Sequence, residues 1–139
     1  MKLKKVRGYI FSRPFMGERA PQHVQNIIIR HYCEKNNLFY LLSSTEYAKK
    51  KSHLMLDQVL NELKNVDGIV AYSLFQLPEN KTLRNKVYNK IIKSKKELHF
   101  SVEGLKIVNS KDIEKIENIW CIKQSLPNCL KKLKNKCVY

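Results

Sequence analysis

Residues 67–77, Asp-Gly-Ile-Val-Ala-Tyr-Ser-Leu-Phe-Gln-Leu, form the stretch of sequence that decides the fold. From residue 68 to residue 72 this stretch is apolar without alternation, which is typical of a parallel strand covered on both faces. Pro78 follows and interrupts regular structure. The stretch therefore predicts a central parallel strand at 68–73 that opens into a loop at 74–80.

Short apolar runs alternate with amphipathic segments on both sides of this strand. The pattern predicts further strands at 5–11, 38–42 and 98–102, and helices at 21–35, 52–65 and 81–93. Strands that alternate with helices indicate right-handed βαβ units. We therefore expect a three-layer α/β fold with about four mainly parallel strands.

The whole chain, residues 1–139, is short enough to form one domain. We expect its core at 5–105 and an irregular, basic helical segment at 106–139. In that segment Ser110 would cap a first short helix, and a second would follow Pro127 at residues 128–136.

Candidate ligand-binding residues lie in the loops that follow the strands, because ligands of open α/β sheets bind beyond the carboxyl ends of the strands. Four loops meet at that edge, at residues 12–22, 43–47, 74–80 and 103–105. The candidates in and beside them are Ser12, Arg13, Arg19, Gln22, Glu46, Tyr47, Tyr72, Gln76 and Glu103.

Two arginines, Arg13 and Arg19, precede the first predicted helix, so guanidinium groups and helix N–H groups would together favour a phosphate or carboxylate. A sugar phosphate or nucleotide-sugar fits this chemistry. The alternative is that these arginines pair with Glu18 or Glu46 and only order the loop. Two carboxylates at the edge would also permit acid–base chemistry, but the sequence assigns no catalytic residue.

The formal net charge is +15, from 27 Lys and Arg against 12 Asp and Glu. Such an excess favours nucleic acid as a partner, and Lys86, Lys90 and Lys93 share one face of the third predicted helix. A solvated helix face, or a codon bias toward lysine, accounts for the same pattern. A DNA-binding protein without cleavage activity is therefore the second hypothesis.

The sequence predicts neither a metal site nor a cofactor. Its cysteines, Cys33, Cys121, Cys129 and Cys137, contain no C-x-x-C pair, and we expect buried or partly buried free thiols. No apolar run approaches the ~18 residues that span a membrane. The basic N-terminus begins like a signal peptide, but no apolar h-region and no small-residue cleavage site follow it. We expect a cytoplasmic protein, and the sequence leaves a homodimer open.

Three stretches, residues 8–13, 67–77 and 97–104, resemble the catalytic domain of the small serine recombinases, the resolvases and invertases. Gly8 and Tyr9 match the start of that family's G-Y-x-R-x-S motif, and Glu103 and Gly104 match its S-E-G-I turn. The resemblance covers residues 5–105 and implies the resolvase fold.

The recombinase chemistry is not implied, because the positions that carry it differ. Phe11 stands at the arginine and Arg13 at the serine of the first motif, while Ser12 lies one residue early. In the D-R-L-x-R motif only Leu77 matches, and the aspartate and both arginines are replaced by Phe75, Gln76 and Glu79. Too few residues follow Gly104 for both the long dimer helix and the DNA-binding domain of that family, so we expect both to be absent.

A closer resemblance is to the sporadic carbohydrate cluster proteins, a degenerate resolvase-like family of similar length. Residues 8–22, Gly-Tyr-Ile-Phe-Ser-Arg-Pro-Phe-Met-Gly-Glu-Arg-Ala-Pro-Gln, are similar to a segment of that family, and the likeness continues to Gly104. It implies a role in surface-polysaccharide biosynthesis and implies no particular reaction.

Overall fold

The structure is a computed structural model that describes the backbone of residues 3–136 and the side chains of residues 3–126. Its strands are β1 (Lys4–Phe11), β2 (Leu38–Glu46), β3 (Gly68–Ala71), β4 (Glu97–Phe100) and β5 (Leu105–Ile107). Its helices are α1 (Gln22–Lys35), α2 (Leu54–Asn61), α3 (Lys81–Lys93) and α4 (Ser110–Lys136), with short 3-10 turns η1 (Leu63–Asn65) and η2 (Leu74–Gln76).

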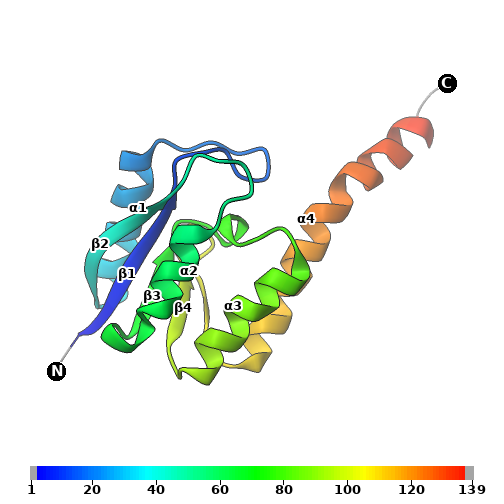
Figure 1. Cartoon of the computed structure of the whole chain (residues 1–139). Helices are drawn as coiled ribbons and strands as arrows, with labels where there is room; N and C mark the ends of the chain where they lie inside the picture. Colours follow the sequence, from blue (N-terminus) through cyan, green and yellow to red (C-terminus); the bar gives the residue numbers. More distant parts are fainter. Residues whose placement is uncertain (1–2, 137–139) are drawn as a thin grey trace.

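The strands form one sheet in the order β2-β1-β3-β4-β5, in which the first four are parallel and β5 is antiparallel to β4. In Figure 1, α2 and α3 cover one face of the sheet and α1 covers the other. The predicted three-layer α/β fold is confirmed. The sheet has one strand more than expected, because the three residues of β5 are too few to produce a recognisable pattern.

The two faces of the sheet carry separate apolar clusters, as the alternation of side chains along a strand requires. Ile69 of β3 packs in the larger cluster with α2, α3 and the first half of α4, whereas Val70 packs with Ile29 and Cys33 of α1. The continuous apolar run at residues 68–72 thus reflects burial on both faces.

Strand β2 continues through residues 43–46, where the sequence predicted a loop. Arg7 pairs with Leu41 and Gly8 with Ser43, so Leu42 forms a bulge whose carbonyl accepts a hydrogen bond from the Arg7 guanidinium. Gly8 permits this close approach, since a Cβ atom there would lie 2.1 Å from Oγ of Ser43. Hydrogen bonding to β1 therefore makes residues 43–46 part of a strand, although their polar side chains are typical of a loop.

Helix α4 replaces the two short helices predicted at the C-terminus, and its 27 residues run through Pro127. A proline in a helix interior removes one helical hydrogen bond and costs about 3 kcal/mol, yet α4 continues past Pro127. The expectation that no long helix follows the core is therefore wrong. The end of α4 extends away from the sheet in Figure 1.

The cysteines follow the prediction only in part. Cys33 is buried, and burial raises the pKa of its thiol to about 11. Cys121 is exposed, contrary to expectation, because it lies on the outward side of α4. The side chains of Cys129 and Cys137 lie outside the described residues. No helix in the described part of the chain combines the length and the apolar character needed to cross a membrane.

Candidate functional site

A cavity of about 600 Å³ lies beyond the carboxyl ends of β1, β2 and β3, and we refer to it as the carboxyl-edge pocket. Its lining comes from residue 11, from the loops at 13–15 and 48–53, and from the segment at 75–83, which runs from η2 into the first turn of α3. The apolar part of the lining includes Phe11, Phe15, Phe75, Leu77, Pro78 and Leu83, and the basic part consists of Arg13, Lys50, Lys51 and His53. Glu79 is the acidic side chain among the lining residues.

Arg13 organises one side of the pocket. Its guanidinium donates to the carbonyl oxygens of Tyr47 and Ser52, both at 2.8 Å, and lies 4.3 Å from the centre of the Phe11 ring. These bonds hold the loop after β2 against β1 and thereby place Lys50 and Lys51 at the pocket. An arginine has five N–H donors, so Arg13 retains donors for a ligand.

Arg13 is the one predicted ligand-binding residue that lines the carboxyl-edge pocket. Arg19 and Gln22 are exposed outside it, because the turn closed by Phe15 and Glu18 directs the chain away from the edge. Tyr47 is exposed beside the pocket and contributes its carbonyl to Arg13.

Glu46 was predicted to face a ligand, but its side chain is only 1% exposed. Its carboxylate accepts hydrogen bonds from the Tyr9 hydroxyl, from Oγ of Ser52 and from the backbone N–H groups of Tyr47, Met55 and Leu56. Met55 and Leu56 belong to the first turn of α2, whose N–H groups have no partner within the helix. Glu46 therefore anchors α2 to the end of β2.

Gln76 is likewise internal, with no exposed surface. Its Nε2 donates to Oε1 of Gln25 at 2.8 Å, and Gln25 in turn bonds both backbone groups of Phe11. The sequence offered no signal for Gln25, which lies 51 residues from Gln76 and meets it only in the folded chain. The two amides join α1, the end of β1 and η2.

The three remaining candidates also have structural partners. Ser12 donates to the Glu46 carbonyl at 2.7 Å, and Glu103 accepts from the Ser73 hydroxyl and the Leu74 N–H at the start of η2. Tyr72 is half-buried against the edge of the Phe15 ring. The side-chain oxygens of Ser12 and Glu103 thus bond within the edge of the sheet, and none of the three residues lines the pocket.

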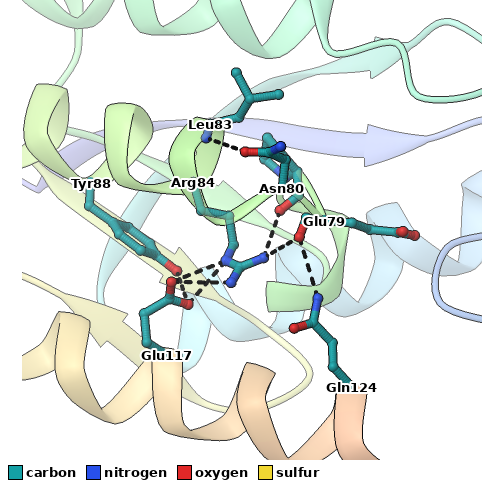
Figure 2. Close-up of polar contacts among 8 residues, drawn as sticks. Glu79, Asn80, Leu83, Arg84, Tyr88, Glu117 and Gln124 are labelled. Carbon is teal, nitrogen blue, oxygen red and sulfur yellow. Dashed lines mark hydrogen bonds and ion pairs between the residues drawn. The ribbon is translucent and has the colours of Figure 1, made fainter. Parts of the chain in front are cut away.

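A buried ion pair fixes the wall of the pocket formed by residues 78–80 (Figure 2). Arg84 of α3 is only 3% exposed and donates to the carbonyl oxygens of Pro78 and Glu79. Its Nε lies 3.0 Å from Oε2 of Glu117 on α4, and Gln124 of α4 also donates to the Glu79 carbonyl. Helix α4 is thus tied to the pocket wall through Arg84 and Gln124.

Sequence reasoning missed Lys50, Lys51 and His53 as lining residues. The run of three lysines at 49–51 was a usable signal, since it follows a strand predicted to end at the ligand edge. His53 is half-buried, and burial, followed by the positive charge of Arg13, lowers the pKa of its imidazole. Its position depends on the turn that Arg13 stabilises and is not encoded in a local motif.

The predicted nucleic-acid residues, Lys86, Lys90 and Lys93, are exposed on α3. Lys86 and Lys90 border a second cavity of about 450 Å³ between α2 and α3, which shares His53 with the carboxyl-edge pocket. Among the residues whose side chains are described, no three His, Cys, Asp or Glu side chains gather in a group able to hold a metal ion.

Comparison with solved structures defines the class of fold. The chain is similar to the N-terminal catalytic domain of TP901-1 integrase, with a TM-score of 0.57 and 16% identity over 91% of this chain and 98% of that one. It is also similar to a resolvase family site-specific recombinase from Streptococcus pneumoniae, with a TM-score of 0.62 and 11% identity over 93% of this chain and 99% of that one.

These likenesses establish a resolvase-like fold, and at such low identity they establish the fold alone. No protein-family model matches the sequence, and no curated protein matches it significantly.

Proposed function

We propose that this resolvase-fold protein binds a phosphorylated sugar, either a sugar phosphate or a nucleotide-sugar, in the carboxyl-edge pocket. The observation that carries the proposal is the lining of that pocket, in which Arg13, Lys50 and Lys51 border an apolar surface that includes Phe11 and Phe75. Cationic side chains recognise phosphate, and apolar surface packs against the ring of a ligand. The volume of about 600 Å³ lies within the ~300–1,000 Å³ typical of small-molecule sites.

The proposal does not include DNA cleavage by the serine mechanism. At the positions that match the recombinase arginines, Phe11 is part of the apolar core, Gln76 is buried and Glu79 carries a negative charge. Arg13 occupies the position of the nucleophile. Phosphoryl transfer depends on positive groups placed against the phosphate, and a phenyl ring, a buried amide and a carboxylate do not supply them.

The resemblance to the sporadic carbohydrate cluster proteins supports a role in the biosynthesis of surface polysaccharides. A phosphorylated sugar is the ligand that such a role would require. The proposal assigns a class of ligand and no reaction, so an enzyme and a binding protein both satisfy it.

Thermal denaturation with glucose 1-phosphate and UDP-glucose tests the proposal. A ligand that binds only the folded state at 100 times its Kd stabilises it by about 2.7 kcal/mol, so we expect at least one of these compounds to raise the Tm by several degrees. The double variant Lys50→Glu/Lys51→Glu should lose this shift, because two exposed pocket cations are replaced by anions that repel the phosphate.

Lys49→Glu is the matched control, since Lys49 is an exposed neighbour in the same loop that does not line the pocket. It should retain most of the shift, as should Arg19→Ala. An equal shift in the double variant would place the ligand elsewhere, and no shift with either compound would contradict the proposal.

DNA binding is the alternative function, and the exposed Lys86, Lys90 and Lys93 on α3 are the residues that would support it. Each phosphate neutralised contributes about −0.9 to the slope of log K against log salt. If the three lysines contact DNA, replacing all of them with Gln should make the slope shallower by about three. We expect the slope to change by less than about one and the ligand-induced Tm shift to persist. A slope shallower by about three, together with loss of the ligand-induced Tm shift, would favour DNA binding.

A further inference from the structure

His53 lies between the carboxyl-edge pocket and the core. It is the residue just before α2, it lines the pocket, and its ring centre lies 5.9 Å from that of Phe11. Its Nδ1 atom is 3.5 Å from the hydroxyl oxygen of Tyr9, which is itself completely buried. One ring nitrogen of His53 is therefore directed toward the core, and Nε2 is the ring nitrogen left for a ligand in the pocket that His53 lines.

The hydrogen bonds of Tyr9 determine which ring nitrogen carries the proton. The Tyr9 hydroxyl donates its single hydrogen to Oε1 of Glu46 at 2.9 Å. The same carboxylate accepts from Oγ of Ser52 and from three backbone N–H groups, so it acts as an acceptor toward Tyr9 as well. The Tyr9 oxygen can then only accept from His53, which places the proton on Nδ1 and leaves a lone pair on Nε2.

The charge state of His53 agrees with this assignment. Burial of the ring and the nearby guanidinium of Arg13 lower the pKa of His53, and these effects outweigh the opposing influence of Glu46, Asp57 and Glu79. The neutral ring is therefore the favoured form at pH 7.5. Within the described contacts, Nε2 has no hydrogen-bond partner of its own.

The structure assigns Nε2 of His53 as the acceptor for a hydroxyl group of the ligand whose phosphate is held by Arg13, Lys50 and Lys51. Arg13 and His53 both lie against the ring of Phe11, close enough for one phosphorylated sugar to reach both. This inference rests on the proposed function and narrows it: the site would select phosphate esters with a free hydroxyl over esters of the same charge without one.

Two ligands matched in charge and ring size test this selectivity: glucose 1-phosphate and cyclohexyl phosphate. By isothermal titration at pH 7.5, the protein should bind glucose 1-phosphate at least about tenfold more tightly, the effect of one well-placed hydrogen bond. His53→Leu should reduce that preference by about tenfold, and His53→Gln, whose amide oxygen still accepts, should restore part of it. His23→Leu, at an exposed position on α1, should leave it unchanged.

The protonation of the ring is measured separately, in the unliganded wild-type protein, from the ¹⁵N chemical shifts of labelled histidine. We expect His53 with hydrogen on Nδ1 and none on Nε2; hydrogen on Nε2 instead would overturn the assignment without any variant. If both phosphates bind equally well, or if His53→Leu keeps the preference, the inference fails while the proposed function stands. If neither phosphate binds, the inference fails, and the proposed function then stands or falls on the Tm shift with UDP-glucose.

Discussion

Replacing Glu117 with alanine should lower the free energy of unfolding by about 3–5 kcal/mol, the cost of leaving one member of a buried ion pair without its partner. Glu117 lies against the guanidinium of Arg84, which is 3% exposed and therefore has no access to water as a substitute. The Tyr88 hydroxyl donates to the same carboxylate and loses its acceptor as well. Urea denaturation followed by circular dichroism measures the change.

Glu114→Ala provides the control, because Glu114 is an exposed glutamate on the same helix, three residues earlier. It should change the free energy of unfolding by less than about 1 kcal/mol, as is usual for surface positions. Because alanine favours a helix more than glutamate does, helix propensity cannot cause a loss in either variant. Comparable losses in the two variants would show that the ion pair is not responsible. Since Arg84 also holds the carbonyl groups of Pro78 and Glu79, Glu117→Ala should weaken the ligand-induced Tm shift too.

Replacing Glu46 with alanine should be similarly destabilising, by about 3–5 kcal/mol. Each buried donor left without an acceptor costs about 1–3 kcal/mol, and Glu46 serves the Tyr9 hydroxyl and the N–H groups of Met55 and Leu56. Urea denaturation again provides the measurement. Glu62→Ala, at an exposed glutamate just after α2, should cost less than about 1 kcal/mol.

A loss below about 1 kcal/mol in Glu46→Ala would contradict the role given to this carboxylate and would remove the basis for the tautomer assigned to His53. The two largest expected effects thus come from two carboxylates that hold the segments around the carboxyl-edge pocket. Glu46 anchors α2 to β2, and Glu117, through Arg84, anchors residues 78–80 to α3 and α4.

Sequence reasoning succeeded where the signal is local. The apolar run at 68–72 correctly predicted a strand buried on both faces, and the alternation of strands and helices correctly predicted a parallel α/β sheet. It was wrong at residues 43–46, which pair with β1 despite their polarity, and at Pro127, which α4 passes through. At residues 43–46 the outcome depends on pairing with β1, which a local pattern does not contain.

The carboxyl-edge pocket lies at the edge of the sheet where the candidate residues were predicted, and Arg13 lines it. Glu46 and Gln76 were misplaced because their burial depends on partners elsewhere in the chain: the N–H groups of α2 and the amide of Gln25. A polar side chain that follows a strand faces either a ligand or an internal donor. Only the packed structure distinguishes the two.

By itself, the sequence determined the fold class, the edge of the sheet at which the polar loops gather and the excess of positive charge, because periodicity, the order of elements along the chain and composition are properties of the chain. The tertiary structure decided which polar groups remain available there. Arg13, whose guanidinium lies over the Phe11 ring, bonds the backbone at both ends of residues 47–52. These bonds place Lys50, Lys51 and His53 at the pocket. That arrangement arises from contacts between residues far apart in sequence, whose geometry no single segment encodes.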